Sequence, residues 1–272
     1  LGTHFLGILD DVRLYNRLLS AAEIQQLYSL GAAKFANSPV MSLPSGLVGD
    51  WTFDGQHTNW ATGKTFDQSG KGNTGTMTNM STSTTPVSGK LGQAFRFDGL
   101  NDAVNAGSAS ILDNMSALSI SVWSKSLSYG GGGLGYIVNK SSGGSSGWTF
   151  LGRVTQTSVR FSVGFDGGTD LVVTAIGALT ASDFNKWIHW TVTWDGSSSA
   201  SNVHIYKNGV VFPTSGTDGV GSRQTDISQN LLIGNNTVSS LTRGFEGSLD
   251  DVRIYNRALS PTEIQRLYQL GR

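Results

Sequence analysis

The sequence predicts an all-β protein, an antiparallel sandwich of short strands with one short helix at its carboxyl end. Two segments alternate apolar and polar residues with the period of a half-buried strand, LSISVWS at 118–124 and WIHWTVTWD at 187–195. A third, VHIYKNGVVF at 203–212, places Asn208-Gly209 between two apolar runs, which is a strong signal for a β-hairpin. Many such runs, separated by turns and followed by one late helical pattern, indicate a β-sandwich.

The composition agrees with this fold class and argues against several kinds of function. The chain has 272 residues, of which 36 are Gly, and this abundance favours strands and turns over long helices. Its formal net charge is zero and only 14% of its residues are charged, so no nucleic-acid partner is expected. No apolar run reaches the length of about 18 residues that membrane insertion requires. The absence of cysteine excludes disulfides, thiolate zinc sites and cysteine nucleophiles.

The most informative feature of the sequence is a repeated segment. Residues 5–31 read FLGILDDVRLYNRLLSAAEIQQLYSLG, and residues 245–271 read FEGSLDDVRIYNRALSPTEIQRLYQLG. The offset between the two copies is 240 throughout. Each copy predicts one strand followed by a short helix, and a helix of this length must dock on a larger body to be stable. The repeat therefore indicates a tandem array of similar modules.

The helix of the second copy carries clear start and stop signals. Ser260 is the expected cap, Glu263 completes a capping box three residues later, and Pro261 occupies the first helical position. Gly271 is placed to end the helix. The apolar residues that share one helical face are Ile264, Leu267 and Tyr268.

These observations divide the chain into three parts. Residues 1–33 are interpreted as the carboxyl-terminal strand and helix of a preceding repeat, because no preceding body accompanies them in this chain. Residues 34–46, KFANSPVMSLPSG, have the Pro, Ser and Asn content of a linker. Residues 47–272 are expected to form one complete domain.

The blocks along residues 47–272 resemble the laminin-G-like jelly rolls of bacterial and archaeal surface proteins, a branch of the concanavalin A-like lectin and glucanase superfamily. The last block is the most specific, and residues 5–31 match that block alone. The resemblance implies two antiparallel sheets packed face to face. The segments that carry it are FDQSGKGNTGTM (66–77), FRFDGLNDAVNAG (95–107), LSISVWSK (118–125), WIHWTVTWDGSS (187–198), VHIYKNG (203–209), LLIG (231–234) and GSLDDVRIYNRALSPTEIQRLY (247–268).

The sequence argues against an enzyme. A glycoside hydrolase of this superfamily needs two facing carboxylates, usually alternate acidic residues on one strand, and no such cluster is present. The three glutamates are Glu23 and Glu263, which are capping residues, and Glu246, which stands alone before the last strand. His189 lies in a strand between two tryptophans and is interpreted as a packed residue rather than a general base.

The resemblance also implies a structural calcium ion, because in this family one is often held where the first and last strands run near each other. Calcium prefers carboxylate, carbonyl and amide oxygens. The candidate ligands are Asp54, Asp67, Asn73 and Asp250, with Asp98 and Asp102 as further candidates.

A simpler interpretation of the same residues is that they form turns, since Asp and Asn bond their own backbone in Asx turns. The adjacent pair Asp250 and Asp251 cannot send both side chains to one face of a regular strand. One of them can bind metal while the other pairs with Arg253 or faces solvent.

Aromatic residues in loops are candidates for ligand binding, because sugar sites combine aromatic surfaces with polar groups. Trp60 and Tyr129 lie in polar or Gly-rich loops and are the candidates chosen here. Trp51, Trp190 and Trp194 fall on the apolar sides of their strands and are expected in the core.

Two functions therefore remain open. The first is a non-catalytic extracellular adhesion module that binds a glycan or a cell-surface protein. The second is a structural repeat of a surface stalk, fibre or filament, in which residues 1–33 mediate self-association by packing or strand addition. A glycoside hydrolase is the least favoured reading.

Overall fold

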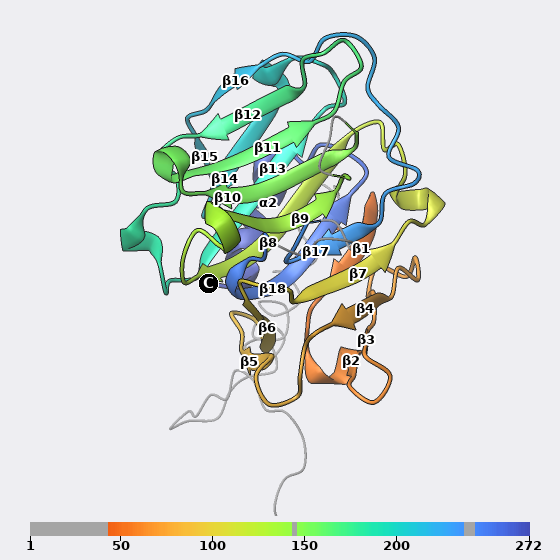
Figure 1. Ribbon diagram of the computed structural model, residues 1–272, viewed down its shortest axis with the longest axis vertical. Coiled ribbons are helices and arrows are strands. Elements are labelled where there is room, and N and C mark those ends of the chain that lie inside the picture. The colour runs from red at the N-terminus through yellow and green to blue at the C-terminus, as the bar shows by residue number, and fades with distance from the viewer. Residues whose placement is uncertain (1–42, 143–145, 237–242) are drawn as a thin grey trace, which may run out of the picture. The chain divides into compact units, whose positions relative to one another are not determined.

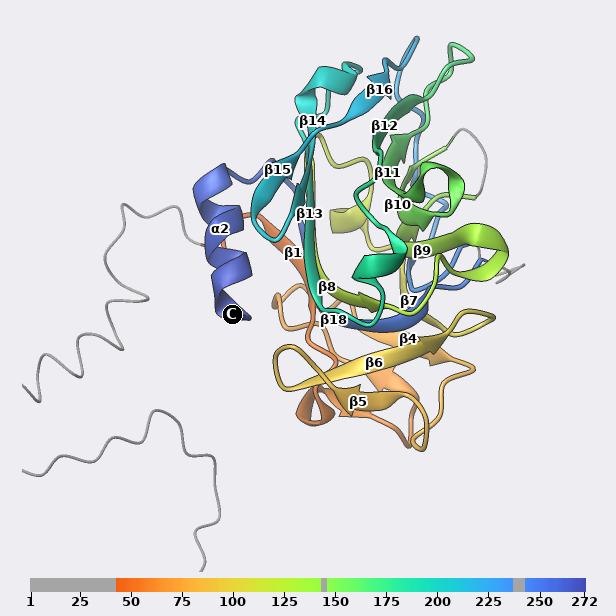
Figure 2. The same ribbon diagram turned by 90° about the vertical axis from the view of Figure 1, so that its left-hand side faces the viewer.

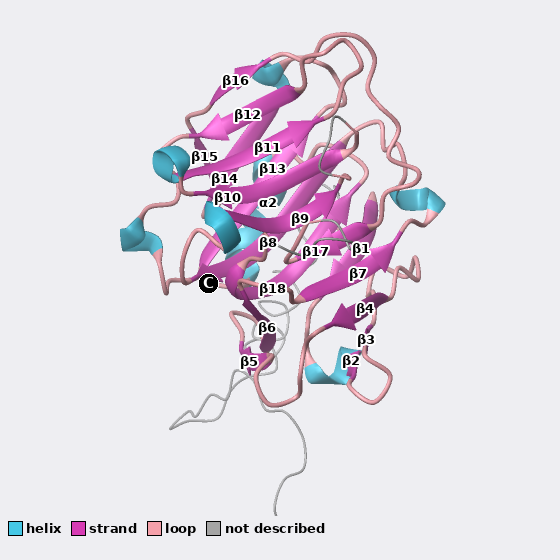
Figure 3. Cartoon of the chain, in the orientation of Figure 1, coloured by secondary structure: helices cyan, strands magenta, loops and turns pink. Residues whose placement is uncertain are grey.

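Two antiparallel sheets packed face to face make up the domain (Figures 1 and 3). The computed structural model describes residues 43–142, 146–236 and 243–272. The predicted tail at residues 1–33 lies outside the described residues. Residues 43–272 form one compact unit, so the last four residues of the expected linker pack with the domain. In the described part of the chain, no helix is long and apolar enough to cross a membrane.

The first sheet, called sheet A here, has eight strands in the order β15-β14-β13-β8-β18-β6-β5, with β1 also paired to β18. Its strands are β1 (Leu47–Trp51), β5 (Pro86–Ser88), β6 (Gln93–Asp98), β8 (Leu118–Ser126), β13 (Ile188–Trp194), β14 (Val203–Lys207), β15 (Val210–Phe212) and β18 (Glu246–Tyr255).

The second sheet, sheet B, has ten strands in the order β16-β12-β11-β10-β9-β17-β7-β4-β3-β2. Its strands are β2 (Thr58–Asn59), β3 (Lys64–Thr65), β4 (Gly75–Thr78), β7 (Ala103–Gly107), β9 (Leu134–Lys140), β10 (Trp148–Arg153), β11 (Ser158–Val163), β12 (Leu171–Ala175), β16 (Ser215–Thr217) and β17 (Leu231–Ile233). Among the described residues, short 3-10 helices occupy six loops: η1 (Gly55–His57), η2 (Ser110–Leu112), η3 (Gly131–Gly133), η4 (Thr155–Thr157), η5 (Ala181–Asp183) and η6 (Ala200–Asn202).

The core lies between the sheets and contains the three tryptophans expected there. Trp51, Trp190 and Trp194 are at most 1% exposed. The alternating patterns of β8 and β13 correctly predict which residues face the core. They do not predict that the opposite face is covered as well: every residue of β13 is buried, His189 included. The reason is tertiary, because a helix packs over that face.

That helix is α2 (Pro261–Leu270), which lies against the outer face of sheet A (Figure 2). Its predicted start is confirmed. The Ser260 side chain accepts a hydrogen bond from the backbone N–H of Glu263, and the Glu263 carboxylate accepts one from the backbone N–H of Ser260. Apolar burial holds the helix in place, in a cluster made of Tyr206, Tyr255, Leu259, Ile264 and Leu267, with Leu43 and Leu47 packed against it.

The hairpin predicted at Asn208-Gly209 joins β14 to β15. Both residues have positive φ, 53° and 77°, as the tightest two-residue β-turn requires. The turn is also attached to α2, because the Gln265 side chain donates a hydrogen bond to the carbonyl of Gly209.

The last strand, β18, occupies the middle of sheet A. It pairs with β8 along one side and with β6 and β1 along the other. Its pairing with β8 is irregular between Asp250 and Arg253, and Asp251 has a φ of 51°, in the left-handed region. Such a bulge bends the strand and re-aims its side chains.

The capping carboxylate of α2 predicts a measurable contribution to stability. Burial raises the pKa of Glu263, but its bonds to Arg257 and Ser260 outweigh this and lower the pKa to about 2. We expect Glu263→Gln to lower the free energy of unfolding by about 2 kcal/mol near neutral pH. Because the folded pKa lies below the unfolded one, this contribution is complete above the ordinary carboxyl pKa and is lost as the pH falls toward about 2. Urea unfolding at several pH values measures it.

The matched control is Thr262→Ala, at an exposed position of the same helical turn. It is expected to change the free energy of unfolding by less than about 0.5 kcal/mol. Equal effects of the two substitutions, or a Glu263→Gln effect that does not depend on pH, would contradict this account.

Candidate functional site

Two of the candidate metal ligands, Asp54 and Asp250, are brought together by the loop of residues 89–93. Asp250 Oδ2 accepts hydrogen bonds from the backbone N–H groups of Lys90 and Leu91, at 2.7 and 2.8 Å. Asp54 Oδ1 accepts one from the backbone N–H of Gln93 at 2.8 Å. The first strand region and the last strand therefore meet over one loop, as the family resemblance implied.

Asp250 is fully buried, and its second carboxylate oxygen, Oδ1, is unusual for a buried polar atom. Oδ1 has no hydrogen-bond partner among the described residues. Burial, together with the nearby charges of Asp251 and Asp54, raises the pKa of Asp250 to about 7, although the two backbone N–H groups lower it. A carboxylate with one unsatisfied oxygen, near a second carboxylate, is an arrangement that a cation would stabilise.

The neighbouring residue Asp251 is held by Arg253 instead. The Arg253 guanidinium lies 2.8 Å from Asp251 Oδ1 and 3.5 Å from Asp50 Oδ1. Burial raises the pKa of Asp251 to about 6, although Arg253 lowers it. The expectation that one aspartate of the pair contacts Arg253 is confirmed. The strict alternation on which it was based does not hold, because the bulge interrupts it.

Asp67 and Asn73 form a separate cluster beside β1. The Asp67 carboxylate accepts bonds from the backbone N–H groups of Asp50, Ser69 and Asn73 and from the Ser69 hydroxyl. These four donors match the acceptor sites of a carboxylate. The Asn73 amide donates to the carbonyl of Val48 at 2.6 Å. The contacts fit both residues as supports of a Gly-rich turn, and Asn73 Oδ1 is buried without a hydrogen-bond partner among the described residues.

The further candidates Asp98 and Asp102 close the turn between β6 and β7. Asp98 Oδ1 accepts bonds from the backbone N–H groups of Leu100, Asn101 and Asp102, and Asp102 Oδ2 accepts one from the backbone N–H of Asp98. Burial, with the Asp98 charge, raises the pKa of Asp102 to about 6. This geometry is that of an Asx-type turn.

The donor set defines what kind of metal site the loop of residues 89–93 offers. Within residues 43–142, 146–236 and 243–272, no three Asp, Glu or His side chains are grouped to hold a metal ion. A site there would combine Asp54 and the free oxygen of Asp250 with backbone carbonyls. Calcium accepts such all-oxygen sets, whereas zinc prefers His and Cys ligands.

The two glutamates among the described residues, Glu246 and Glu263, are both engaged in hydrogen bonds. Glu246 accepts a hydrogen bond from the Ser128 hydroxyl, and Glu263 is engaged by Arg257 and Ser260. Asp250 has the raised pKa of a general acid, but it is 0% exposed, so no substrate oxygen can reach it.

His189 is also buried rather than reactive. It packs against the rings of Trp123 and Tyr268, at centroid distances of 5.0 and 6.0 Å, and these two rings also contact each other at 5.7 Å. Its Nε2 is 2.8 Å from the Ser121 hydroxyl. Burial lowers its pKa to about 3, assisted by the charge of Arg253. This agrees with the interpretation of His189 as a packed strand residue.

The two aromatic candidates lie in different loops and are half-buried. Trp60 follows β2 and packs 5.6 Å from the ring of Phe95. Tyr129 follows β8 and packs edge-on against Phe184 at 5.0 Å. Each offers part of its ring to solvent and part to the core.

Sheet B presents a polar face that sequence reasoning missed. Arg160 alternates with core residues along β11, and Arg153 ends β10, so both point away from the sandwich interior. Arg160 is the cross-strand partner of Leu151, and Arg153 follows Leu151 two residues later on β10. On the other side of β10, Leu151 is paired with Tyr136 of β9. The Nε atoms of both arginines are buried without a hydrogen-bond partner among the described residues. Burial and the charge of Arg153 lower the pKa of Arg160.

This face differs from the outer face of sheet A in one respect. Helix α2 packs on sheet A, whereas no α-helix of the described chain covers β9 to β12 of sheet B (Figure 2). The alternation in SVRFSV at 158–163 is the signal that could have identified Arg160 as an outward-facing residue.

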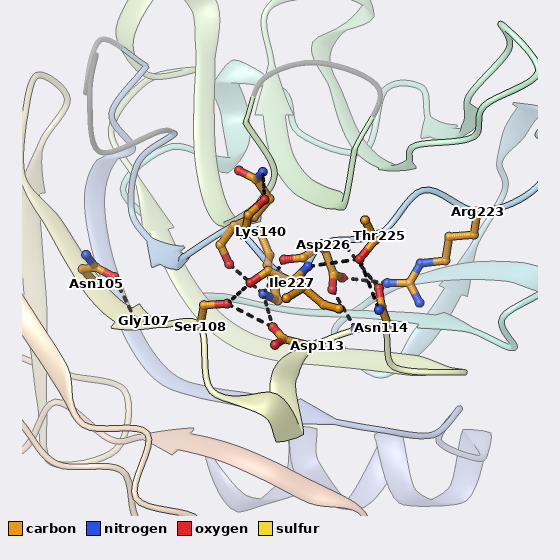
Figure 4. A network of polar contacts seen from close by, with 12 residues as sticks. Asn105, Gly107, Ser108, Asp113, Asn114, Lys140, Arg223, Thr225, Asp226 and Ile227 are labelled. Carbon is orange, nitrogen blue, oxygen red and sulfur yellow. Dashed lines mark hydrogen bonds and ion pairs between the residues drawn. The ribbon is translucent and has the colours of Figure 1, made fainter.

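Another charged cluster, centred on Lys140, is structural (Figure 4). The ammonium group is 0% exposed and bonds to Asp113 Oδ1 and to the carbonyls of Asp226 and Gln229, at 2.8, 3.0 and 2.6 Å. These three bonds use all three of its donors. The cluster therefore ties the loops before β8 and β17 together.

With this geometry established, comparison with known proteins identifies the family. The model of the concanavalin A-like lectin/glucanases superfamily matches residues 97–265, more than half of the chain. The chain therefore belongs to this superfamily, and the expected family and fold are confirmed. A search of curated proteins found no match.

Several solved structures share the fold at low sequence identity. The binding domain of Paraclostridial Mosquitocidal Protein 1 has a TM-score of 0.60 and 17% identity, with 84% of this chain and 52% of that chain covered. Domain 4 of AbnA, an extracellular arabinanase of Geobacillus stearothermophilus solved with arabinotriose, has a TM-score of 0.54 and 19% identity, covering 83% and 99%. The binding domain of botulinum neurotoxin DC, in complex with rat synaptotagmin II, has a TM-score of 0.56 and 15% identity, covering 85% and 53%. This chain spans about half of the two toxin binding domains.

The buried state of His189 predicts a pH dependence of stability. Because its folded pKa of about 3 lies below the unfolded value of about 6.5, only the unfolded chain takes up a proton between these pH values. This part of the stability is complete above about pH 6.5 and falls by up to about 1.4 kcal/mol per pH unit below it. We expect the His189→Gln variant to lose less stability than the parent chain between about pH 6.5 and pH 4, in urea unfolding.

His204→Gln is the control, because His204 is exposed in the adjacent strand β14. The free energy of unfolding of His204→Gln is expected to change with pH in the same way as that of the parent chain. A His189→Gln curve parallel to the parent curve over this range would contradict the buried, neutral state of His189.

Proposed function

We propose that this chain is a non-catalytic binding module of an extracellular protein, and that its ligand is a glycan. The observation that carries the proposal is the outward face of sheet B, where Arg153 and Arg160 lie on neighbouring strands with both Nε atoms unpartnered among the described residues. The Asp170 charge acts on Arg160, but no ion pair to either guanidinium is found there. Two half-buried guanidinium groups with free donors favour an anionic group between them. The ligand class is therefore a glycan that bears a carboxylate or a sulfate.

The related structures support a binding role without defining the ligand. Two of them are binding domains of toxins, and a third is a domain of an arabinanase solved with a sugar. The engaged glutamates and the buried Asp250 support the non-catalytic part of the proposal. An extracellular location agrees with the lack of cysteine only if the parent protein is exported without disulfides.

The glycan proposal is tested by an array of neutral and anionic oligosaccharides, including arabinotriose and heparin-derived fragments. We expect anionic glycans to bind, and Arg153→Ala and Arg160→Ala each to weaken binding about tenfold, or about 1.4 kcal/mol, through the loss of a charge-assisted contact. Arg272→Ala, which removes an exposed charge at the end of the chain, is the matched control. Binding that survives both arginine substitutions overturns the site, and Trp60→Ala and Tyr129→Ala then show whether either aromatic loop holds the ligand instead.

We also propose that a calcium ion supports the module, with Asp54 and Asp250 as ligands. The unpartnered Asp250 Oδ1 beside a second carboxylate is the observation that favours it. When bound, the ion would neutralise two acidic groups and link the residue 89–93 loop to β18. Its role would be structural, since Asp250 is fully buried.

Calcium is expected to raise the melting temperature of the parent chain, because a ligand that binds the folded state stabilises it by mass action. Asp54→Asn and Asp250→Asn should abolish the increase between chelator and calcium. Asp67→Asn is the matched control: it should lower the melting temperature in both conditions, because Asp67 supports its turn, but retain the calcium increase. A parent chain that melts at the same temperature in chelator and in calcium excludes the ion.

A structural role in an array of such modules is the second candidate function. The observation that favours it is the second copy of the β18–α2 sequence at residues 5–31. In this reading the tail joins neighbouring modules of a stalk, fibre or filament.

A further inference from the structure

The copy of the repeat at residues 245–271 lies in the described structure, and it shows which positions of the repeat are buried or make specific contacts. Residues 5–31 and 245–271 differ at eight positions. The differing pairs are Leu6/Glu246, Ile8/Ser248, Leu14/Ile254, Leu18/Ala258, Ala21/Pro261, Ala22/Thr262, Gln26/Arg266 and Ser29/Gln269.

Seven of these eight differences fall at positions that are exposed or half-buried in β18 and α2. The eighth, Leu14/Ile254, is an exchange between aliphatic residues of equal volume, which cores tolerate well. Every other buried position of the segment is identical in the two copies. These positions are Phe245, Gly247, Leu249, Asp250, Asp251, Val252, Tyr255, Leu259, Glu263, Ile264, Leu267 and Gly271.

Positions that make specific contacts are retained as well. A Cβ on Gly247 would lie 2.2 Å from the carbonyl oxygen of Lys125, and Gly7 occupies the equivalent place. The two residues of the Arg257–Glu263 ion pair have the same residue types at the corresponding sequence positions, Arg17 and Glu23. Gln265, which bonds to the carbonyl of Gly209 on the β14–β15 turn, recurs as Gln25.

The surface that receives β18–α2 is a slot in sheet A, and we define the slot as the edges of β1, β6 and β8 together with the apolar cluster under α2. β18 satisfies backbone groups of all three strands. A strand placed there must therefore present the correct side chains to both faces of the sheet, because a shift by one residue exchanges the faces. At the positions that are buried in residues 245–271, residues 5–31 have the same residue types in the same order, apart from Leu14 in place of Ile254.

We propose that residues 5–31 are a second closing segment, able to occupy the slot in a body of residues 43–244 in place of residues 245–271. The binding partner of residues 5–31 is thus the slot of a body that has the sequence of residues 43–244. This proposal gives the structural candidate function a mechanism, and it does not depend on glycan binding.

A set of substitutions in the full chain tests it. Leu249 is 0% exposed at the centre of β18, so Leu249→Asp buries an unpaired carboxylate and prevents residues 245–271 from filling the slot. We expect this single variant to keep one cooperative unfolding transition, with a melting temperature within about 10 °C of the parent, because residues 5–31 replace the damaged segment. Leu9→Asp alone should melt with the parent chain, and the double variant should lose the transition. Circular dichroism during heating measures all four chains.

Two further variants in the Leu249→Asp background sharpen the test. Gly7→Val should abolish the transition as Leu9→Asp does, because its side chain would meet the carbonyl that Gly247 approaches closely. Ala22→Thr should have no effect, because it copies a difference found at the exposed position 262. Equal melting behaviour of Leu249→Asp and the double variant overturns the proposal, whether or not the module binds a glycan.

Discussion

The structure depends on the ability of one strand, β18, to carry charged residues through the middle of a sheet. Removing a carboxylate from water costs several kcal/mol unless it is bonded or paired. β18 meets this cost in two ways. Asp250 receives two backbone N–H bonds from the residue 89–93 loop, and Asp251 receives the guanidinium of Arg253. The bulge at Asp251 makes both arrangements compatible with one strand.

The position of β18 also determines how the two ends of the domain are connected. As the last strand in the sequence, it pairs with β1, the first, and with β6 and β8 from the early part of the chain. Sheet A is continuous only when this strand is in place. Helix α2 then buries the outer face of the sheet, and this explains why β8 and β13 carry buried polar residues such as His189 on a face that their pattern would leave in water.

The two sheets consequently have different roles. The outer face of sheet A is filled by α2 and its apolar cluster, whereas sheet B keeps an outward face with two arginines and a tyrosine. Asp250 and Asp251 lie buried in sheet A, whereas Arg153 and Arg160, whose Nε atoms lack a hydrogen-bond partner among the described residues, lie on the outward face of sheet B. This difference between the two faces is the basis for proposing an anion-binding surface on sheet B.

The sequence by itself determined the fold class, the hairpin at Asn208-Gly209 and the capped helix that starts at Ser260, because each of these depends on local periodicity or on a few adjacent residues. It also placed Trp190 and Trp194 in the core. It could bring Asp54 and Asp250 together only through the family resemblance, since they lie 196 positions apart in the sequence and no local signal links them. Only the tertiary structure showed that the Asp67 carboxylate accepts four hydrogen bonds. It also showed that a bulge lets Asp250 and Asp251 have different partners. Finally, it placed Arg153 and Arg160 on the same outward face of sheet B. These outcomes depend on which strands become neighbours and which face a helix covers, and both are set by the packing of residues distant in the sequence.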